Sequence, residues 1–287
     1  MYPSDENNPG IANASASTTP TDDCSVLCQT KPKRQLDDGK LERLIVLMDI
    51  DATMLESKWF STQEEADKHV ANLPKDAEGK TVRCLQTPWE FDDDIWVIKF
   101  RPGLRQFLDE LSPIVDLHIY TAGTKRYAHC VRREIESMCG KRYFSPDKVW
   151  SREEHVHFIE GGSYYKHLDE LPLGRNDLSR VILIDDNSNH LVVNPGNVYP
   201  IGKFSNDNTD TELMHAVDFL KNQLIGCSDV RPVMRARKEE AAAFRYMMGW
   251  KTISVQQMNA YFASQSLQRA PMASSSLAAS KETSPSQ

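Results

Sequence analysis

Two carboxylates stand directly after an apolar run in the first half of the chain. Residues 44–48 are all apolar, and Asp49 and Asp51 follow them, two positions apart. A short apolar run that ends in polar residues is typical of a strand buried on both faces of a parallel sheet. Burying two carboxylates together is costly unless a cation or dense hydrogen bonding compensates. The pattern predicts a cation site at a strand end, although an Asx-type turn would explain this segment taken alone.

Two further segments that read as core strands also end in polar residues. Residues 114–120 lead into Thr121, and residues 181–184 lead into Asp185 and Asp186. Helical periodicity between the runs predicts a parallel sheet, in which ligands gather outside the carboxyl ends of the strands. Each strand end alone is a weak signal. Their convergence on one edge of the sheet is a strong one.

The residue types at this edge predict phosphoryl chemistry with a hard cation. Carboxylates from two strands suit Mg²⁺, which prefers oxygen ligands and would let several acids stay ionised side by side. A hydroxyl from Thr121 and an ammonium from Lys166 suit an anion with several oxygens, namely phosphate. One aspartate could then attack phosphorus, while a second protonates the leaving oxygen and later activates water. Lys148 and Lys203 also lie near strand ends and are the alternatives to Lys166.

The elements that position these residues follow from hydrophobic periodicity. Apolar residues at i, i+3, i+4 and i+7 predict a helix over 104–111, with Pro102 in its first turn. Residues 56–94 are expected to form a small insert of turns and hairpins. The other expected elements are strands at 95–100, 148–150 and 198–201, a short helical piece opened by 164–168, and helices at 127–138, 209–224 and 231–245.

Composition divides the chain into four parts. Residues 1–38 are rich in Ser, Thr, Asn, Asp and Pro, without an apolar period, and are expected to form a disordered tail. Residues 39–225 hold all the strand-end motifs and form the predicted catalytic domain. Residues 226–263 are expected to be a helical extension that packs back on this domain. Residues 264–287 are rich in Ser and Ala and are predicted to be a second disordered tail.

Charge and composition exclude several classes of partner. The net charge of −7 argues against direct nucleic-acid binding, and no apolar stretch approaches the roughly 20 residues of a membrane span. The N-terminal residues show neither a secretory signal nor a transit peptide. Six cysteines without a CxxC pair suggest reduced thiols in a cytosolic or nuclear protein. The basic run at residues 31–34 is either a nuclear-import signal or solvated charge.

These motifs resemble a known superfamily. The sequence is similar to the haloacid dehalogenase (HAD) superfamily in four motifs, which follow in order: Asp49-Ile50-Asp51-Ala52-Thr53, Thr121, Lys166 and Asp185-Asp186. Within it, the chain resembles the FCP/SCP phosphatases, which act on phosphoserine in the C-terminal domain of RNA polymerase II, at residues 101–105, 117–124 with 127–128, and 194–197. The resemblance covers roughly residues 41–225. It implies an α/β, HAD-like Rossmannoid three-layer fold with a central parallel sheet and a small insert instead of a large cap.

The resemblance also implies a role for each residue. Asp49 would be the nucleophile, Asp51 the general acid and base, and Thr121 and Lys166 the phosphate ligands. Mg²⁺ would be held by Asp49, the backbone carbonyl of Asp51, and Asp185. The chain departs from the family at Ala52, where Glu is usual, and in a longer segment before Lys166.

The leading expectation is a Mg²⁺-dependent serine/threonine protein phosphatase, with a phosphoprotein or phosphopeptide as its partner and a nuclear or cytoplasmic location, the nucleus being favoured by the resemblance. The gaps between motifs leave no room for a large lid, so the site should be open to a protein segment. Residues 99–152 hold eleven Lys or Arg against six Asp or Glu, which could steer such a substrate or be a solvated helix face. A small-molecule phosphatase and a non-catalytic binding module of the same fold are the alternatives. Oligomeric state stays open.

Overall fold

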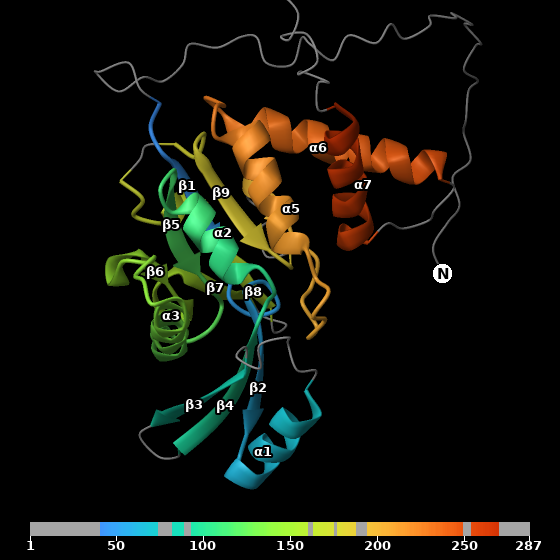
Figure 1. The fold of residues 1–287 in the computed structure, drawn as a ribbon. Coiled ribbons are helices and arrows are strands. Elements are labelled where there is room, and N and C mark those ends of the chain that lie inside the picture. Colours follow the sequence, from blue (N-terminus) through green and yellow to red (C-terminus); the bar gives the residue numbers. More distant parts are fainter. Residues whose placement is uncertain are drawn as a thin grey trace, which may run out of the picture. The chain divides into compact units, whose positions relative to one another are not determined.

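The centre of the fold is a parallel sheet of five strands in the order β10-β9-β1-β5-β6 (Figure 1). Its strands are β1 (Leu44–Met48), β5 (Val115–Tyr120), β6 (Val149–Trp150), β9 (Val181–Asp185) and β10 (Val198–Pro200). The computed structural model describes residues 41–73, 82–88, 93–159, 163–174, 177–187, 194–248 and 254–269. The expected α/β fold with a central parallel sheet is confirmed.

β1 is buried on both faces, as its uniform apolar sequence predicts. Leu44, Val46 and Met48 belong to one hydrophobic cluster, whereas Ile45 and Leu47 belong to another. The first cluster also takes in buried residues of α2 (Leu104–Leu111), α3 (Lys125–Cys139) and α5 (Glu212–Phe219). The second face is covered more thinly, by the single 3-10 turn Leu168–Glu170 and short segments around it. The sheet therefore carries its main helical layer on one face.

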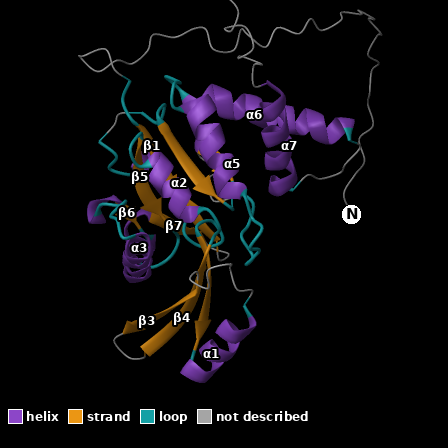
Figure 2. Ribbon diagram, in the orientation of Figure 1, coloured by secondary structure: helices purple, strands orange, loops and turns teal. Residues whose placement is uncertain are grey.

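The segment between β1 and β5 forms the expected small insert rather than a large cap. It contains β2 (Leu55–Phe60), α1 (Gln63–Asn72), β3 (Val82–Pro88) and β4 (Asp93–Phe100), and its antiparallel sheet has the order β2-β4-β3 (Figure 2). Ala66, Ile95 and Val97 make a separate small core. The helix α1 was not predicted. Its start is a capping sequence, Thr62 to Glu65, in which the Thr62 hydroxyl accepts a hydrogen bond from the Glu65 amide.

Two local predictions are wrong. Residues 163–166 form a strand, β8 (Ser163–Lys166), which pairs antiparallel with β7 (Val156–Ile159), so no helical piece opens at 164. The α2 helix begins at Leu104 and not at Pro102. Gly103 precedes it with φ of 78°, a left-handed backbone angle that interrupts the helix and favours glycine.

The C-terminal region packs on the domain, as expected. A π-turn (Leu220–Leu224) ends α5, and α6 (Val230–Met247) then adds Val230 and Met234 to the main hydrophobic cluster. The last described helix, α7 (Val255–Arg269), runs past the boundary predicted at residue 263, and residues 270–287 of the expected tail lie outside the described residues. The other expected tail, residues 1–38 with its basic run, lies outside the described residues.

No helix in the described part of the chain is both long and apolar enough to span a bilayer. Among the described residues, Cys130, Cys139 and Cys227 form no disulfide.

Candidate active site

The carboxyl ends of three adjacent strands bring the predicted acids and hydroxyl together. β1 pairs in parallel with both β5 and β9, and Met48 lies opposite Ile119 on one side and Ile184 on the other. Asp49, Thr121 and Asp185 follow these positions, and all three are buried. Residues far apart in the sequence therefore meet at one edge of the sheet, as the strand pattern predicts.

Lys166 links two of these acids. Its Nζ donates to Asp49 Oδ1 at 2.7 Å and to Asp185 Oδ2 at 2.8 Å, and the side chain is only 1% exposed. The two alternative lysines do not bridge these acids, although the charge of Lys203 acts to lower the pKa of Asp186. Lys148 donates to Asp116 at 2.6 Å, and Lys203 is exposed. Of the three lysines, Lys166 is the one whose ammonium bridges the buried acids.

Three carboxylates can converge on one point. Oxygens of Asp49, Asp185 and Asp186 all lie within 4.8 Å of one another. Asp186 was not among the ligands expected from the sequence, although it completes the predicted pair with Asp185. The Asp51 carboxylate is not part of this group, in keeping with the prediction that Asp51 contributes only its backbone carbonyl to a metal ion.

The charges of the cluster are not balanced. Burial is the main factor that raises the pKa of Asp49, the charges of Asp185 and Asp51 raise it further, and Lys166 opposes them. The pKa of Asp186 is also raised, first by burial and then by Asp185. Burial alone would lower the pKa of Lys166, but Asp185 and Asp49 raise it overall. One ammonium faces three close carboxylates, and a divalent cation with a preference for oxygen ligands fits this donor set.

Two hydroxyl groups fix the side chain of Asp51. Its Oδ1 accepts hydrogen bonds from Ser57 Oγ at 2.5 Å and from Tyr127 OH at 2.7 Å. Burial, followed by the negative charge of Asp51, raises the pKa of Tyr127 well above its ordinary value, so this phenol stays a donor. Ser57 lies on β2 and Tyr127 on α3. In the sequence Tyr127 belongs to an apolar stripe and to the family resemblance, neither of which gives it a role at the site, and nothing singles out Ser57.

Thr121 lies at the carboxyl end of β5, the neighbour of β1. Its amide donates to Trp150 O at 3.0 Å, and its Oγ1 accepts from the Gly123 amide at 3.0 Å. A Cβ at Gly123 would lie 2.8 Å from a ring carbon of Tyr127, so this close turn requires glycine. No hydrogen bond runs from the Thr121 hydroxyl to another described side chain. This leaves its hydrogen for an incoming acceptor.

A second threonine ties the first strand end to the third. The Thr53 hydroxyl accepts from the Asp186 amide at 3.1 Å and lies 3.4 Å from Asp186 Oδ1. The Asn187 amide in turn donates to Asp185 Oδ1 at 2.7 Å. These contacts fix the orientation of the paired acids without using the oxygen that faces Lys166.

The acids open into a cleft of about 750 Å³. Its polar floor includes Asp49, Asp51 and Thr121. The walls of the cleft carry aromatic and basic side chains: Trp59, Trp96, Tyr127, Arg126 and Arg152. Trp59 and Trp96 stand opposite each other on β2 and β4, and the Trp96 ring lies 5.2 Å from that of Tyr127. The insert therefore forms one wall of the site.

Comparison with known proteins places these features in a family. The family model described as NLI interacting factor-like phosphatase matches residues 44–231. An RNA polymerase II C-terminal domain phosphatase of Schizosaccharomyces pombe is 34% identical over 148 residues, which cover 50% of this chain and 19% of that protein. The mitochondrial import inner membrane translocase component tim50 of Aspergillus fumigatus is 30% identical over 144 residues, 49% of this chain and 26% of that one. The chain thus spans about a fifth to a quarter of these two relatives.

A solved structure is also similar. It is an arginine-to-alanine variant of the fission yeast RNA polymerase II CTD phosphatase Fcp1 bound to beryllium fluoride. The match covers 81% of this chain and 76% of that one, with a TM-score of 0.49 and 19% sequence identity.

Proposed function

The chain belongs to the NLI interacting factor-like phosphatase family, and we propose that it is a Mg²⁺-dependent protein phosphatase that removes phosphate from serine or threonine. The observation that supports this most is the contact of Lys166 with Asp49 and Asp185, beside a hydroxyl-bound Asp51. The substrate would be an extended phosphorylated segment, such as the C-terminal domain of RNA polymerase II. A nuclear location is part of the same proposal.

In the first step, a carboxylate oxygen of Asp49 attacks phosphorus and forms an aspartyl-phosphate as the bond to the serine or threonine oxygen breaks. Asp51 gives its proton to that leaving oxygen. In the second step, Asp51 takes a proton from water, whose oxygen attacks phosphorus, and inorganic phosphate leaves as Asp49 is restored. The ammonium of Lys166 and the hydroxyl of Thr121 stabilise the phosphoryl oxygens in both steps.

The residues present fit a magnesium ion. Asp49 and Asp185 would hold it, together with the backbone carbonyl of Asp51, and Asp186 lies close enough to contribute directly or through water. When bound, the ion supplies positive charge that neutralises the phosphoryl oxygens. It would also offset the excess of carboxylates around Lys166.

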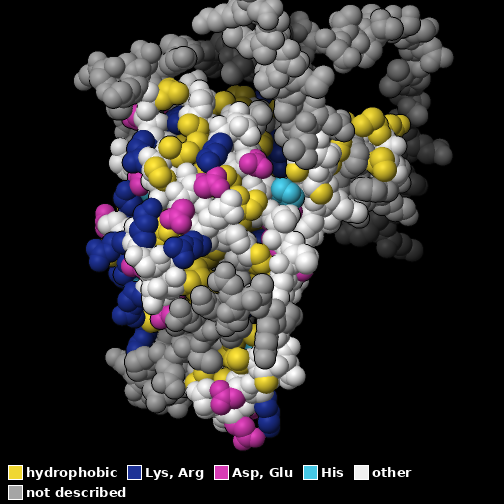
Figure 3. Space-filling view, in the orientation of Figure 1, with side chains coloured by type: hydrophobic (Ala, Val, Ile, Leu, Met, Phe, Trp, Pro, Cys, Tyr) yellow, Lys and Arg dark blue, Asp and Glu magenta, His cyan; other side chains and the backbone are white. Residues whose placement is uncertain are grey.

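The walls of the cleft favour a peptide over a small metabolite. Trp59 is 51% exposed. Its flat apolar ring offers a surface against which side chains of an extended peptide can pack. Arg126 lies exposed in the first turn of α3, where a cation opposes the helix dipole. Figure 3 shows Lys and Arg side chains gathered along the side of the molecule where Figure 1 places α3. An open cleft with these walls suits a phosphorylated protein segment.

Removal of the nucleophile tests the proposal. Asp49→Asn should lower turnover of p-nitrophenyl phosphate and of phosphoserine peptides by at least about 10³-fold. Asp169→Asn changes an exposed carboxylate outside the cleft and should leave turnover unchanged. EDTA should abolish wild-type turnover, and Mg²⁺ should restore it. Retained activity in Asp49→Asn would contradict the assignment.

A comparison of substrates separates the peptide proposal from its nearest rival. The ratio of kcat to KM should be higher for phosphoserine peptides than for sugar phosphates. Trp59→Ala should raise KM for the peptides and leave KM for p-nitrophenyl phosphate unchanged. Equal efficiency on both classes would favour a small-molecule phosphatase, and no turnover on any of them a binding module.

A further inference from the structure

The turn that carries Asp51 has a backbone conformation that needs outside support. Ala52 has φ of 57°, in the left-handed region that residues with a Cβ adopt at a cost. Its amide donates to Leu55 O at 2.7 Å, which closes the turn, and its own carbonyl accepts from the Phe204 amide at 2.8 Å. The shape of the turn is therefore fixed partly by a segment about 150 residues later in the chain.

A buried arginine supplies most of the remaining support. Arg101 is 1% exposed, and all five of its guanidinium hydrogens have acceptors. Nη1 donates to the carbonyls of Ala52 and Thr53 at 3.4 and 3.1 Å. Nε and Nη2 form a two-pronged ion pair with Asp210, at 2.8 and 2.7 Å. The Arg101 amide also donates to Met54 O at 2.9 Å, so Arg101 holds three successive carbonyls of the turn.

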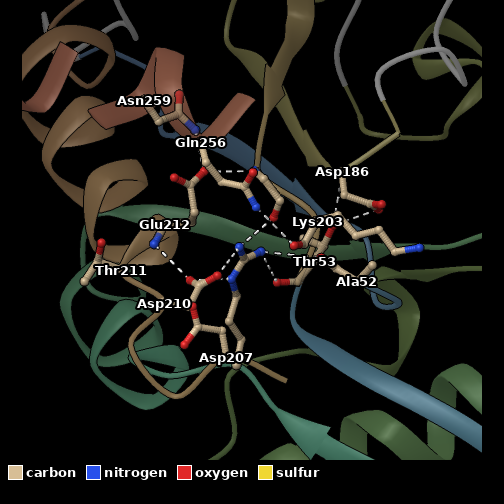
Figure 4. A network of polar contacts seen from close by, with 12 residues as sticks. Ala52, Thr53, Asp186, Lys203, Asp207, Asp210, Thr211, Glu212, Gln256 and Asn259 are labelled. Atoms are coloured by element: carbon tan, nitrogen blue, oxygen red, sulfur yellow. Dashed lines mark hydrogen bonds and ion pairs between the residues drawn. The ribbon is translucent and has the colours of Figure 1, made fainter. Parts of the chain in front are cut away.

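The guanidinium connects the turn to the segment after β10. Nη2 of Arg101 donates to the carbonyl of Gly202 at 2.6 Å. The Gly202 amide donates to Glu212 Oε2 at 2.8 Å, and Glu212, at the start of α5, is 5% exposed. Figure 4 shows these polar groups converging between the Ala52–Thr53 turn and the C-terminal helices.

The last helix completes the chain of contacts. Asn259 of α7 is fully buried, and its Nδ2 donates to the same Glu212 Oε2 at 2.6 Å. Its Oδ1 accepts from Arg237 of α6 at 2.5 Å. The Arg237 guanidinium lies 4.0 Å from the ring centre of Phe262, also on α7. Burial alone would raise the pKa of Glu212, but His215, whose Nδ1 lies 3.7 Å from Oε1, and hydrogen bonds from Asn259 and the Gly202 amide lower it overall, so the carboxylate stays an ionised acceptor.

The surface of α7 is fitted closely to this segment. A Cβ built on Gly202 would lie 2.5 Å from Cγ of Gln256, closer than side chains approach in proteins. All three of the nearest atoms belong to Gln256, and Gln256 Nε2 lies 3.4 Å from Lys203 O. Gly202 therefore has room for α7 only because it lacks a side chain.

We propose that α7 is a positioning element of the active site, which acts on the Asp51 turn through Asn259 and Glu212. This helix lies beyond residues 44–231, which the family model matches. Glu212, Gly202 and Arg101 transmit its position to the carbonyls of Ala52 and Thr53. Asn259 and Glu212 touch no substrate atom in this scheme and are positioning residues. Only the expected effect on turnover rests on the proposed phosphatase function.

Hydrogen exchange of the full-length protein tests the link without an assay of activity. Asn259→Ala should raise the exchange rates of the amides at 52–55 by about fivefold. It removes one buried hydrogen bond from the chain of contacts that holds this turn, so the turn should open more often. Gly202→Ala should do the same by pushing on Gln256, and Gln256→Ala added to it should restore slow exchange. Glu239→Gln, at an exposed position of α6, is the control.

The kinetic readout separates positioning from general loss of structure. Well below the melting temperature, Asn259→Ala and Gly202→Ala should lower kcat several-fold with KM unchanged, and the Gly202→Ala, Gln256→Ala pair should recover it. Should Asn259→Ala fail to fold, the Gly202 series decides alone. Wild-type exchange at 52–55 in every folded variant, with faster exchange confined to α7, would overturn the inference. If the wild type had no turnover, the phosphatase proposal would fail while the exchange result still decided this one.

Discussion

Two buried cationic side chains, Lys166 and Arg101, contact the segment that follows β1, and they differ in how completely their partners match them. Arg101 meets one carboxylate and three carbonyls, and each of its hydrogens has an acceptor. Lys166 meets two carboxylates with a third close by, so negative charge is in excess. Because every acceptor around Arg101 is matched by a hydrogen, its contacts fix the backbone of the Ala52–Thr53 turn. A set of partners with an excess of negative charge suits the metal ion proposed above.

The largest difference between the two should appear in turnover. Lys166→Met removes the ammonium that faces the phosphoryl oxygens, so kcat should fall by about 10³-fold. Lys148→Met, which breaks the contact with Asp116 on the same sheet, should leave kcat unchanged. Steady-state kinetics with p-nitrophenyl phosphate measures both. Equal losses in the two variants would show that Lys166 acts through the fold.

The second effect should appear in stability rather than chemistry. Arg101→Lys keeps the charge but cannot form the two-pronged pair and the carbonyl contacts together, and should lower the free energy of unfolding by about 3 kcal/mol. Urea denaturation measures this change. Arg105→Lys, in an exposed pair with Asp109, serves as the matched control and should show no measurable change. A small loss in Arg101→Lys would mean that the turn is held by other contacts.

The third effect should be the stabilisation by Mg²⁺, which should depend on the acids around Lys166 and not on Arg101. Mg²⁺ at ten times its dissociation constant should add about 1.4 kcal/mol to the free energy of unfolding, because it binds the folded state alone. Asp185→Asn should lose this increment, and Arg101→Lys should retain it despite its lower starting stability. Thermal melts with and without Mg²⁺ test the pair. An increment that survives in Asp185→Asn would place the ion elsewhere.

The last effect is on how the free energy of unfolding depends on pH. Its sign should be opposite for Asp49, beside Lys166, and for Glu212, in the network of Arg101. The pKa of Asp49 is raised, mainly by burial, so the metal-free folded state binds more protons than the unfolded chain, and stability should fall as pH rises above about 4. The pKa of Glu212 is lowered overall: burial raises it, and nearby His215 together with hydrogen bonds from Asn259 and the Gly202 amide outweighs that effect. Its contribution is therefore present above about pH 4.3 and lost as pH falls through the folded pKa.

Denaturation in EDTA across this pH range tests both signs. Asp49→Asn should weaken the decrease in the free energy of unfolding as pH rises above about 4. Glu212→Gln should weaken its decrease as pH falls below about 4.3. If Asp49→Asn kept the wild-type slope above pH 4, the decline would have to come from Asp186, whose pKa is also raised by burial.

Most of the catalytic edge could be predicted because its geometry follows from a general rule. Once the strands before Asp49, Thr121 and Asp185 are parallel neighbours, their carboxyl ends must meet. Lys166 was predicted from chemistry and family resemblance, although its local structure was wrong. Four residues of β8 are too few to show a period, and the strand exists because β7 pairs with it.

The residues that support the site could not be found in the same way. Arg101 is visible in the sequence as part of a motif, but its acceptors lie 48 to 109 positions away, and no pattern in the sequence brings those segments together. Asn259 lies in a region to which the sequence assigns only packing. The helix α1, in contrast, has a recognisable capping sequence at Thr62 and could have been predicted.

The order in which the strands leave the ribosome has a consequence for when the proposed site can form. Asp49 and Lys166 are separated by 117 positions, and β9 is made later still. During synthesis the acids after β1 therefore remain in water, where their charges need no partner, until nearly the whole domain has emerged. Contacts of such long range form late in folding. An incomplete chain should therefore lack the proposed phosphatase activity, which should begin only when the sheet is complete.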